Sequence, residues 1–190
     1  MQMQKGWELK LKVNPIKNKD IRNKIELLLK TKSKRNYLLY ILGTNTALRI
    51  GDILKLTVAD VKGNRIIVKE QKTGKIKSMP INAKLKEVIR VYTKGMKDTE
   101  VLFKSRKGVN KAISRIQAYR IMHNIGKMFG LAQIGSHSLR KTFAYVYYKA
   151  TKDIATLMQL LKHSSEKITL RYIGIEDENL DNAYMLVAEL

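Results

Sequence analysis

Five side chains that lie far apart in the sequence are of types that could act together on a phosphate. His137 and Arg140 are three residues apart, and in a helix this spacing places both side chains on one face. His163 and Tyr172 follow later in the chain, and Arg49, far upstream, supplies a second arginine. Guanidinium groups grip a phosphate with two hydrogen bonds, and a phenol can attack phosphorus. Such a set could hold a phosphodiester while the tyrosine attacks it.

The charge of the chain indicates the kind of partner that such a site would meet. The 190 residues include 38 Lys and Arg but only 16 Asp and Glu, which gives a formal net charge of +22. A field of this sign attracts polyanions, and duplex DNA or RNA is the usual partner. The alternative is a soluble protein that is rich in lysine for reasons unrelated to binding. The charge is uneven, because residues 176–190 contain five acids and no base.

The composition also excludes several classes of protein. The chain has no cysteine, so disulfide frameworks and thiolate metal sites are excluded. It has no run of about 18 apolar residues, which argues against a membrane span, and its first residues contain no apolar signal core. We therefore expect one cytoplasmic domain with a core built from apolar residues, which make up 44% of the chain.

Apolar periodicity predicts that most of the chain is helical. Apolar residues recur at helical spacing, and capping residues stand at several predicted helix starts. The predicted helices cover residues 16–30, 34–44, 82–94, 110–129, 154–161 and 179–190, with Asn82 and Asp153 as caps. A further short helix begins at Ser165 or Glu166 and carries Tyr172. A β-branched run with its return strand predicts a hairpin over residues 65–81, so the expected fold is mainly α with a small antiparallel β-sheet.

The stretch around Arg49 is the first part of the candidate site. We expect Thr46 to cap a helix that carries Arg49 and Asp52 within an apolar stripe. A partly buried arginine there needs an anion, which would be Asp52, a ligand phosphate or both. A solvated Arg49–Asp52 pair on a helix surface is the simpler alternative, and this stretch taken alone favours it.

The predicted hairpin is the second part. It carries four lysines, at Lys69, Lys72, Lys75 and Lys77. A basic hairpin can enter a groove of DNA or follow its backbone, and Lys69, Lys75 and Lys77 are interpreted as DNA-binding residues. The alternative is an exposed turn that is rich in lysine like the rest of the chain.

The third part is the helix that follows Ser136, which is predicted to be its N-cap. His137 and Arg140 then fall in the first turn, where backbone N–H groups and the positive end of the helix dipole favour a phosphate. His123 lies in the predicted helix 110–129 with no motif around it, and it is interpreted as structural.

The order of these motifs resembles the catalytic domain of the tyrosine recombinases, the family of phage integrases and Xer-type enzymes. The set runs from Thr-Ala-Leu-Arg-Ile-Gly-Asp (46–52) through a hairpin lysine to His-Ser-Leu-Arg (137–140). It continues with Leu-Leu-Lys-His-Ser-Ser (160–165) and ends at Tyr172, nine residues after His163. Single members are weak signals, since the chain has nine tyrosines. The complete ordered set covers most of the chain and is specific.

The resemblance implies a role for each of the five side chains. Arg49 and Arg140 would clamp the non-bridging oxygens of the scissile phosphate. His137 and His163 would hydrogen-bond the same phosphate and assist proton movement. Tyr172 would attack phosphorus and form a 3′-phosphotyrosyl link. The physical reason is that fixed guanidinium groups stabilise negative charge where it develops during phosphoryl transfer.

Two further roles follow from the resemblance. Lys72, at the hairpin tip, would protonate the departing 5′ oxygen, and Asp52 would orient Arg49. A lysine among other cations can have a pKa low enough to give up a proton. One phosphodiester is exchanged for another, so we expect no cofactor. We expect no metal either, because no carboxylate cluster suggests a divalent ion and two histidines without a third ligand make a poor zinc site.

The expected organisation is a catalytic domain over residues 1–175, followed by an amphipathic helix within residues 176–190. In the family, the segment after the tyrosine often packs into a neighbouring protomer, and here it could do so or fold back in cis. Most relatives have a separate N-terminal DNA-clamping domain, whereas only 48 residues precede Arg49. The chain would then be an excised fragment or a naturally short recombinase.

The main hypothesis is a site-specific DNA recombinase, an integrase of a phage or mobile element, that acts on double-stranded DNA without metal or ATP. It would assemble as a homo-oligomer, a tetramer, on DNA, in the bacterial cytoplasm at the nucleoid and without a membrane partner. Two alternatives stay open, a type IB topoisomerase-like enzyme that relaxes DNA and a DNA-binding regulator without catalysis. The intact set that includes Tyr172 argues against the regulator.

Overall fold

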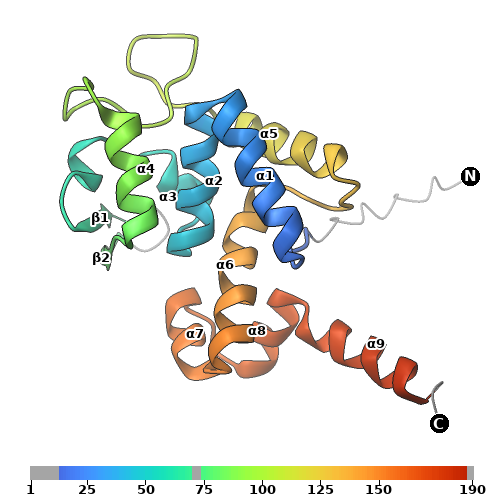
Figure 1. Cartoon of the computed structure of the whole chain (residues 1–190). Coiled ribbons are helices and arrows are strands. Elements are labelled where there is room, and N and C mark those ends of the chain that lie inside the picture. The colour runs from blue at the N-terminus through green and yellow to red at the C-terminus, as the bar shows by residue number, and fades with distance from the viewer. Residues whose placement is uncertain (1–12, 70–73, 188–190) are drawn as a thin grey trace, which may run out of the picture.

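The computed structural model describes residues 13–69 and 74–187, and in that part of the chain it is mainly helical with one two-stranded antiparallel sheet. The elements are α1 (Lys19–Lys32), α2 (Lys34–Thr46), α3 (Ile50–Ile53), the 3-10 turn η1 (Ala59–Val61), β1 (Arg65–Lys69), β2 (Ile76–Pro80), α4 (Ala83–Thr93), α5 (Arg115–Met128), α6 (Ser136–Thr151), α7 (Ile154–Leu161), α8 (Glu166–Ile173) and α9 (Ile175–Val187). This arrangement, shown in Figure 1, confirms the predicted fold class.

Capping side chains set the starts of several helices. The side chain of Asn82 accepts a hydrogen bond from the N–H of Leu85 at 2.9 Å and so begins α4. Asp153 accepts from the N–H of Thr156 at 3.0 Å and begins α7, and Ser165 caps α8 in the same way. Each cap satisfies an N–H group that the first helical turn leaves without an internal partner. The predicted caps at Asn82 and Asp153 are therefore confirmed.

α5 and α9 are two of the helices that begin elsewhere than predicted. α5 starts at Arg115 and not at Asn110, because the preceding stretch is held in a loop. Asn110 has a positive φ of 49°, and its side-chain oxygen accepts a hydrogen bond from the N–H of Val101 at 2.9 Å, so the chain is not helical there. α9 starts four residues earlier than predicted, because Gly174 turns the chain at a φ of 73° and a new helix begins at Ile175.

The hairpin has the register expected of two short paired strands. β1 and β2 pair from Arg65 opposite Pro80 to Lys69 opposite Ile76. Alternate residues of β1 are buried, which is typical of a strand with one face on the core. The predicted hairpin is confirmed, and the residues at its tip, 70–73, lie outside the described part of the chain.

Two hydrophobic clusters hold the molecule together, and α6 runs from one to the other. The larger cluster packs α1, α2, α4, α5 and the hairpin around fully buried residues such as Leu38, Ile41 and Phe103. The smaller cluster lies among α6, α7, α8 and the start of α9, with Leu157 and Ile173 fully buried. Figure 1 shows α6 leaving the upper group of helices and entering the lower group. The relative position of the two groups therefore depends on this helix.

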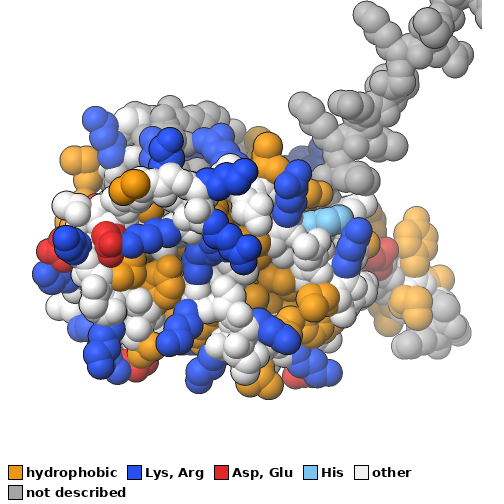
Figure 2. All heavy atoms as spheres, turned by 90° about the horizontal axis from the view of Figure 1, so that it is seen from above, with side chains coloured by type: hydrophobic (Ala, Val, Ile, Leu, Met, Phe, Trp, Pro, Cys, Tyr) orange, Lys and Arg blue, Asp and Glu red, His pale blue; other side chains and the backbone are white. Residues whose placement is uncertain are grey.

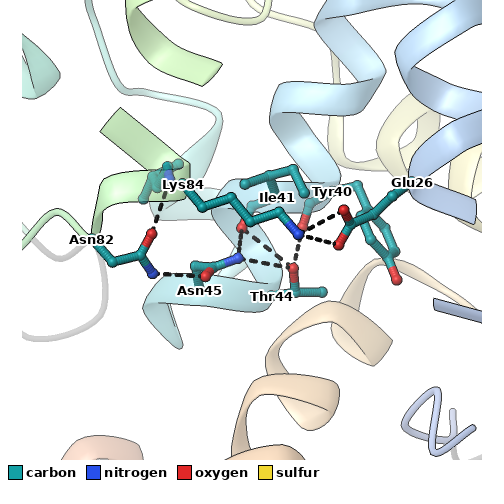
Figure 3. A network of polar contacts seen from close by, with 8 residues as sticks. Glu26, Tyr40, Ile41, Thr44, Asn45, Asn82 and Lys84 are labelled. Carbon is teal, nitrogen blue, oxygen red and sulfur yellow. Dashed lines mark hydrogen bonds and ion pairs between the residues drawn. The ribbon is translucent and has the colours of Figure 1, made fainter. Parts of the chain in front are cut away.

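A polar network fastens α4 to α1 and α2 at the surface of the larger cluster. Lys84 of α4 forms an ion pair with Glu26 of α1 at 2.6 Å. Asn82 donates to the side-chain oxygen of Asn45 in α2 at 2.8 Å, and Asn45 donates to the carbonyl of Ile41 at 2.7 Å (Figure 3). The network holds the end of α2 in place, and that end leads directly into the candidate site.

α9 points away from the other helices beyond its first turn (Figure 1). Its apolar side chains Leu180, Tyr184 and Val187 are 60%, 77% and 69% exposed. A helix is thus present where one was predicted, with residues 188–190 outside the described part of the chain, and in this single chain its apolar residues face solvent.

Candidate active site

The turn between α2 and α3 places Arg49 at a helix start rather than inside a helix. α2 continues through Thr46, whose hydroxyl donates to the carbonyl of Leu42 at 2.8 Å, so the prediction that Thr46 caps the next helix is wrong. Threonine can make this bond one turn back instead of capping. Ala47 then adopts a left-handed conformation and ends α2. Arg49, half-buried, is the N-cap residue of α3, and Asp52, in the first turn of that helix, is only 2% exposed.

Arg140 lies at the junction of three segments and is 7% exposed. One terminal nitrogen donates to the carbonyl of Ala47, directly after α2, and the other donates to the carbonyl of Leu161, at the end of α7, at 3.0 Å. Carbonyls at helix ends lack internal partners, so the guanidinium satisfies two of them. The two bonds fix the plane of the guanidinium group, as a clamp for a phosphate requires.

The start of α6 differs by one residue from the prediction. The N-cap is Gly135, and Ser136 is the first helical residue. The hydroxyl of Ser138 accepts a hydrogen bond from the N–H of Gly135 at 3.1 Å, so a side chain inside the first turn bonds back to the N-cap residue, and Ser136 is not the cap. His137 and Arg140 still fall near the beginning of the helix, and the side chain of His137 is exposed there.

His163 and Tyr172 meet beside α6. Their ring centres are 5.0 Å apart in an edge-to-face arrangement. Nδ1 of His163 is 3.1 Å from the hydroxyl of Thr169, which lies one turn before Tyr172 in α8. The ammonium group of Lys141, which follows Arg140 in α6, lies 4.8 Å from the centre of the Tyr172 ring. The structure thus brings the tyrosine, the second histidine and the arginine-bearing helix together.

The electrostatic coupling among these groups appears in their pKa values. Burial raises the pKa of Tyr172, while Arg140, by its charge and a hydrogen bond, and Arg49 lower it. Burial, Arg140 and Arg49 lower the pKa of His163. His137 reaches solvent, but partial burial of its ring and the charge of Arg140 lower its pKa as well. In the free protein at pH 7, both histidines are therefore neutral and the phenol is protonated.

The hairpin lysines are placed differently from one another. Lys72 lies outside the described residues. Lys69 and Lys75 are exposed, whereas Lys77 is half-buried and its ammonium group is 3.5 Å from the carbonyl of Leu160 in α7. The next carbonyl along α7, that of Leu161, accepts the hydrogen bond from the guanidinium group of Arg140 in α6. β2 therefore lies beside the candidate site.

Sequence reasoning missed two residues of this region, Lys141 and Thr169. Both are buried, at 5% and 0% exposure, and both contact the His163–Tyr172 pair. Thr169 stands one helical turn before Tyr172, and that spacing was the available signal. Nothing distinguishes Lys141 in the sequence from the many other lysines. His123, interpreted as structural, stacks on a tyrosine ring of the same helix with ring centres 5.5 Å apart.

The face of the molecule seen from above the view of Figure 1 is basic. Figure 2 shows a face on which Lys and Arg side chains are widely spread and acidic side chains are few. Such a surface favours a polyanion. Within residues 13–69 and 74–187, no group of three or more His, Asp or Glu is placed to hold a metal ion. The same residues include no helix that is long and apolar enough to cross a membrane.

Comparison with known proteins decides the family. The pattern described as the phage integrase family matches residues 16–179. This chain belongs to the phage integrase family. The probable integrase/recombinase YoeC of Bacillus subtilis is 46% identical over 179 residues, which cover 94% of this chain and 98% of that protein. The tyrosine recombinase XerA of Saccharolobus solfataricus is 29% identical over 143 residues, which cover 74% of this chain and 46% of that protein.

Solved structures share the fold of this integrase-family chain. A XerA recombinase superposes with a TM-score of 0.71 at 21% identity, over 97% of this chain and 66% of that chain. A lambda integrase dimer bound to a COC′ core site superposes with a TM-score of 0.65 at 20% identity, over 90% of this chain and 62% of that chain. The family and the fold that the motifs indicated are confirmed. The chain spans nearly all of the Bacillus relative but less than half of the XerA relative.

Proposed function

We propose that this integrase-family chain is a tyrosine recombinase that breaks and rejoins DNA through a 3′-phosphotyrosyl intermediate. The hydroxyl of Tyr172 attacks phosphorus and loses its proton, the bond from phosphorus to the 5′ oxygen breaks, and the leaving oxygen takes up a proton. A free 5′ hydroxyl of another strand then attacks the phosphotyrosine and releases Tyr172. Each step exchanges one phosphoester for another, so atoms and charge balance without ATP.

The position of Arg140 carries the proposal. Its guanidinium is held by the carbonyls of Ala47 and Leu161, and it also hydrogen-bonds Tyr172. A phosphate beside the phenol would meet a fixed cation where negative charge develops. Arg49 acts on the same phenol through its charge and would stabilise the other non-bridging oxygen.

The remaining groups would move protons and orient the clamp. A neutral His163 beside Tyr172 can take part in removing the phenol proton, and His137 would hydrogen-bond the phosphate. Lys72 would protonate the leaving 5′ oxygen. Asp52, buried in the first turn of α3, would fix the orientation of the first arginine.

The proposed partner is double-stranded DNA in the bacterial cytoplasm, on which this chain would act as the integrase of a phage or mobile element. The net charge of +22 and the hairpin lysines Lys69, Lys75 and Lys77 support binding to a phosphate backbone. One structurally similar protein is a Tn1549 transposon integrase in complex with a circular intermediate DNA. Exchange between two duplexes requires four strand cleavages, so we propose a homo-tetramer on DNA.

The test is covalent trapping in EDTA. The protein is mixed with nicked duplexes, from which the cleaved 5′ fragment diffuses away, and DNA-linked protein is then detected after denaturation. Wild type should form adducts and Tyr172→Phe none, at nearly unchanged DNA affinity. Tyr184→Phe, which removes an exposed hydroxyl from α9, is the matched control and should keep the adduct yield.

Three outcomes would contradict the proposal. Equal adduct yield from Tyr172→Phe would remove this tyrosine as the nucleophile. Tight, salt-sensitive DNA binding without any adduct would favour the non-catalytic regulator. Relaxation of supercoiled DNA by a monomer without a preferred site would favour the topoisomerase-like enzyme.

A further inference from the structure

The chain turns sharply two residues after Tyr172. α8 ends at Ile173, Gly174 adopts a φ of 73°, and α9 begins at Ile175. Ile173 and Ile175 are buried in the smaller cluster, at 0% and 4% exposure. These apolar contacts hold the turn against the molecule, but the hydrophobic effect is not directional. Another interaction must fix the rotation of α8 and the direction in which α9 leaves.

A single carboxylate fastens the first turn of α9. Oε1 of Glu178 accepts a hydrogen bond from Lys149 at 2.7 Å, and Oε2 accepts from Lys17 at 3.0 Å and from the hydroxyl of Tyr145 at 3.1 Å. Lys17 also donates to the carbonyl of Gly174 at 3.0 Å. Burial opposes ionisation of Glu178, but its three hydrogen bonds outweigh burial and lower the pKa of the carboxyl to about 2. The carboxylate is therefore charged at any pH used in a cleavage assay.

The donors to Glu178 belong to segments that are already fixed relative to the candidate site. Tyr145 and Lys149 lie on α6, the helix that carries Arg140. Lys17 precedes α1, and the residue before it is tied to α6, because the N–H of Ile16 donates to a threonine hydroxyl of that helix at 2.8 Å. Glu178 thus connects the chain after the nucleophile to the helix that carries the phosphate-binding arginine.

We propose that Glu178 is a positioning residue for Tyr172, an inference that rests on the proposed function. It acts through Lys17 and the turn at Gly174, and it does not touch the reacting phosphate. Without the carboxylate, Ile173 and Ile175 stay buried, but α8 can rotate. The phenol of Tyr172 then spends less time beside Arg140. A misplaced reacting group lowers the rate of the chemical step while leaving DNA affinity intact.

The test compares two substitutions that each remove one ion-paired carboxylate. Glu178→Gln keeps the shape of the side chain and removes its charge. Glu26→Gln does the same to the Glu26–Lys84 pair of Figure 3, whose carboxylate has a similar exposure, 24% against 19%, in the larger cluster. The single-turnover cleavage rate at saturating nicked duplex, the DNA Kd and the Tm are measured for both. Glu178→Gln should lower the rate roughly tenfold with an unchanged Kd, and Glu26→Gln should keep the wild-type rate.

A charge exchange separates positioning from a general structural effect. Glu178→Lys alone should cleave slowly, because three cations then meet at the base of α9. Combining it with Lys149→Glu restores an opposite charge at the same place and should recover part of the cleavage rate. Recovery of the rate at a constant Kd supports an ionic contact that sets the position of the nucleophile.

Several outcomes would overturn the proposal. An unchanged rate for Glu178→Gln would show that the apolar anchors suffice, and an equal loss in Glu26→Gln would show that any lost ion pair slows cleavage. A loss that appears in Kd instead of the rate would mean that Glu178 serves DNA binding. If wild type itself formed no adducts, the proposed function would fall and this inference with it, whereas wild-type adducts with an unaffected Glu178→Gln would overturn only the inference.

Discussion

The two hydrophobic clusters differ both in size and in what they hold. Among the described residues, the larger cluster contains 28 buried side chains and the smaller contains seven. Among the partly buried side chains packed against each cluster, three of nine are aromatic at the larger cluster and four of six at the smaller one, where Tyr172 is among them. Arg140 ties α6 to the smaller cluster, since both of its carbonyl partners belong to that cluster: Ala47 directly after α2, and Leu161 at the end of α7.

This difference indicates how stability and activity are divided in the molecule. Apolar burial stabilises a fold roughly in proportion to the area removed from water, so the larger cluster should supply most of the free energy of folding. The smaller cluster can open locally at lower cost. The proposed nucleophile, Tyr172, therefore lies on the part that we expect to open more easily, and we propose that polar contacts such as those of Arg140 and Glu178 hold it in position.

The largest effect is expected at Arg140, which ties α6 to the ends of α2 and α7. Arg140→Ala should lower the single-turnover cleavage rate by about two orders of magnitude or more, because it removes a charge donor to the transition state. It should also lower the Tm, because two carbonyls lose their donor. Arg90→Ala, at an exposed ion pair on α4, is the control and should change neither. A normal cleavage rate would mean that Arg140 only ties α6 to the ends of α2 and α7.

A pair of truncations tests the division directly. Leu38 and Leu157 are both fully buried, one in each cluster. Leu38→Ala should lower the free energy of unfolding by roughly 2–5 kcal/mol, while the folded fraction still cleaves DNA normally. Leu157→Ala should lower the free energy of unfolding by less than Leu38→Ala does. It should lower the cleavage rate by more, since we expect the smaller cluster to position Tyr172. Denaturant unfolding and single-turnover cleavage measure both quantities, and equal effects from the two variants would remove the distinction.

A smaller effect is expected from pH. The pKa of His163 is lowered in the folded protein by burial and by Arg140 and Arg49. Between this lowered value and the usual pKa of about 6.5, the unfolded chain binds more protons than the folded one, so stability falls as pH decreases through that window. Above it the histidine contributes no pH dependence. His163→Gln should reduce the loss of Tm between pH 7 and pH 5, and the same loss in both proteins would contradict this.

The smallest effect concerns the larger cluster. Tyr40 is 1% exposed, and its hydroxyl has no hydrogen-bond partner among the residues that the structure describes. Tyr40→Phe should therefore leave stability unchanged or raise it by up to about 1 kcal/mol. Tyr92→Phe is the matched control, because that hydroxyl donates to the carbonyl of Leu102 at 2.6 Å and its loss should destabilise. Equal destabilisation by both would show that the Tyr40 hydroxyl is satisfied in solution.

Local signals predicted much of the fold, and long-range contacts account for the errors. The caps Asn82 and Asp153 were predictable because each bonds an N–H only three residues away. The start of α5 was not, because Asn110 is held by Val101 across a loop. Thr46 was assigned to the wrong helix because its hydroxyl can serve either the turn before it or the turn after it.

The sequence by itself determined the types and the order of the candidate reacting groups, and with them the family. These are patterns that can be read along the chain without knowing where it folds. Only the tertiary structure decided that Arg140 is held by carbonyls of two distant segments and that three donors converge on Glu178. Such contacts join residues that share no local pattern, and they form only once the two clusters have packed against α6.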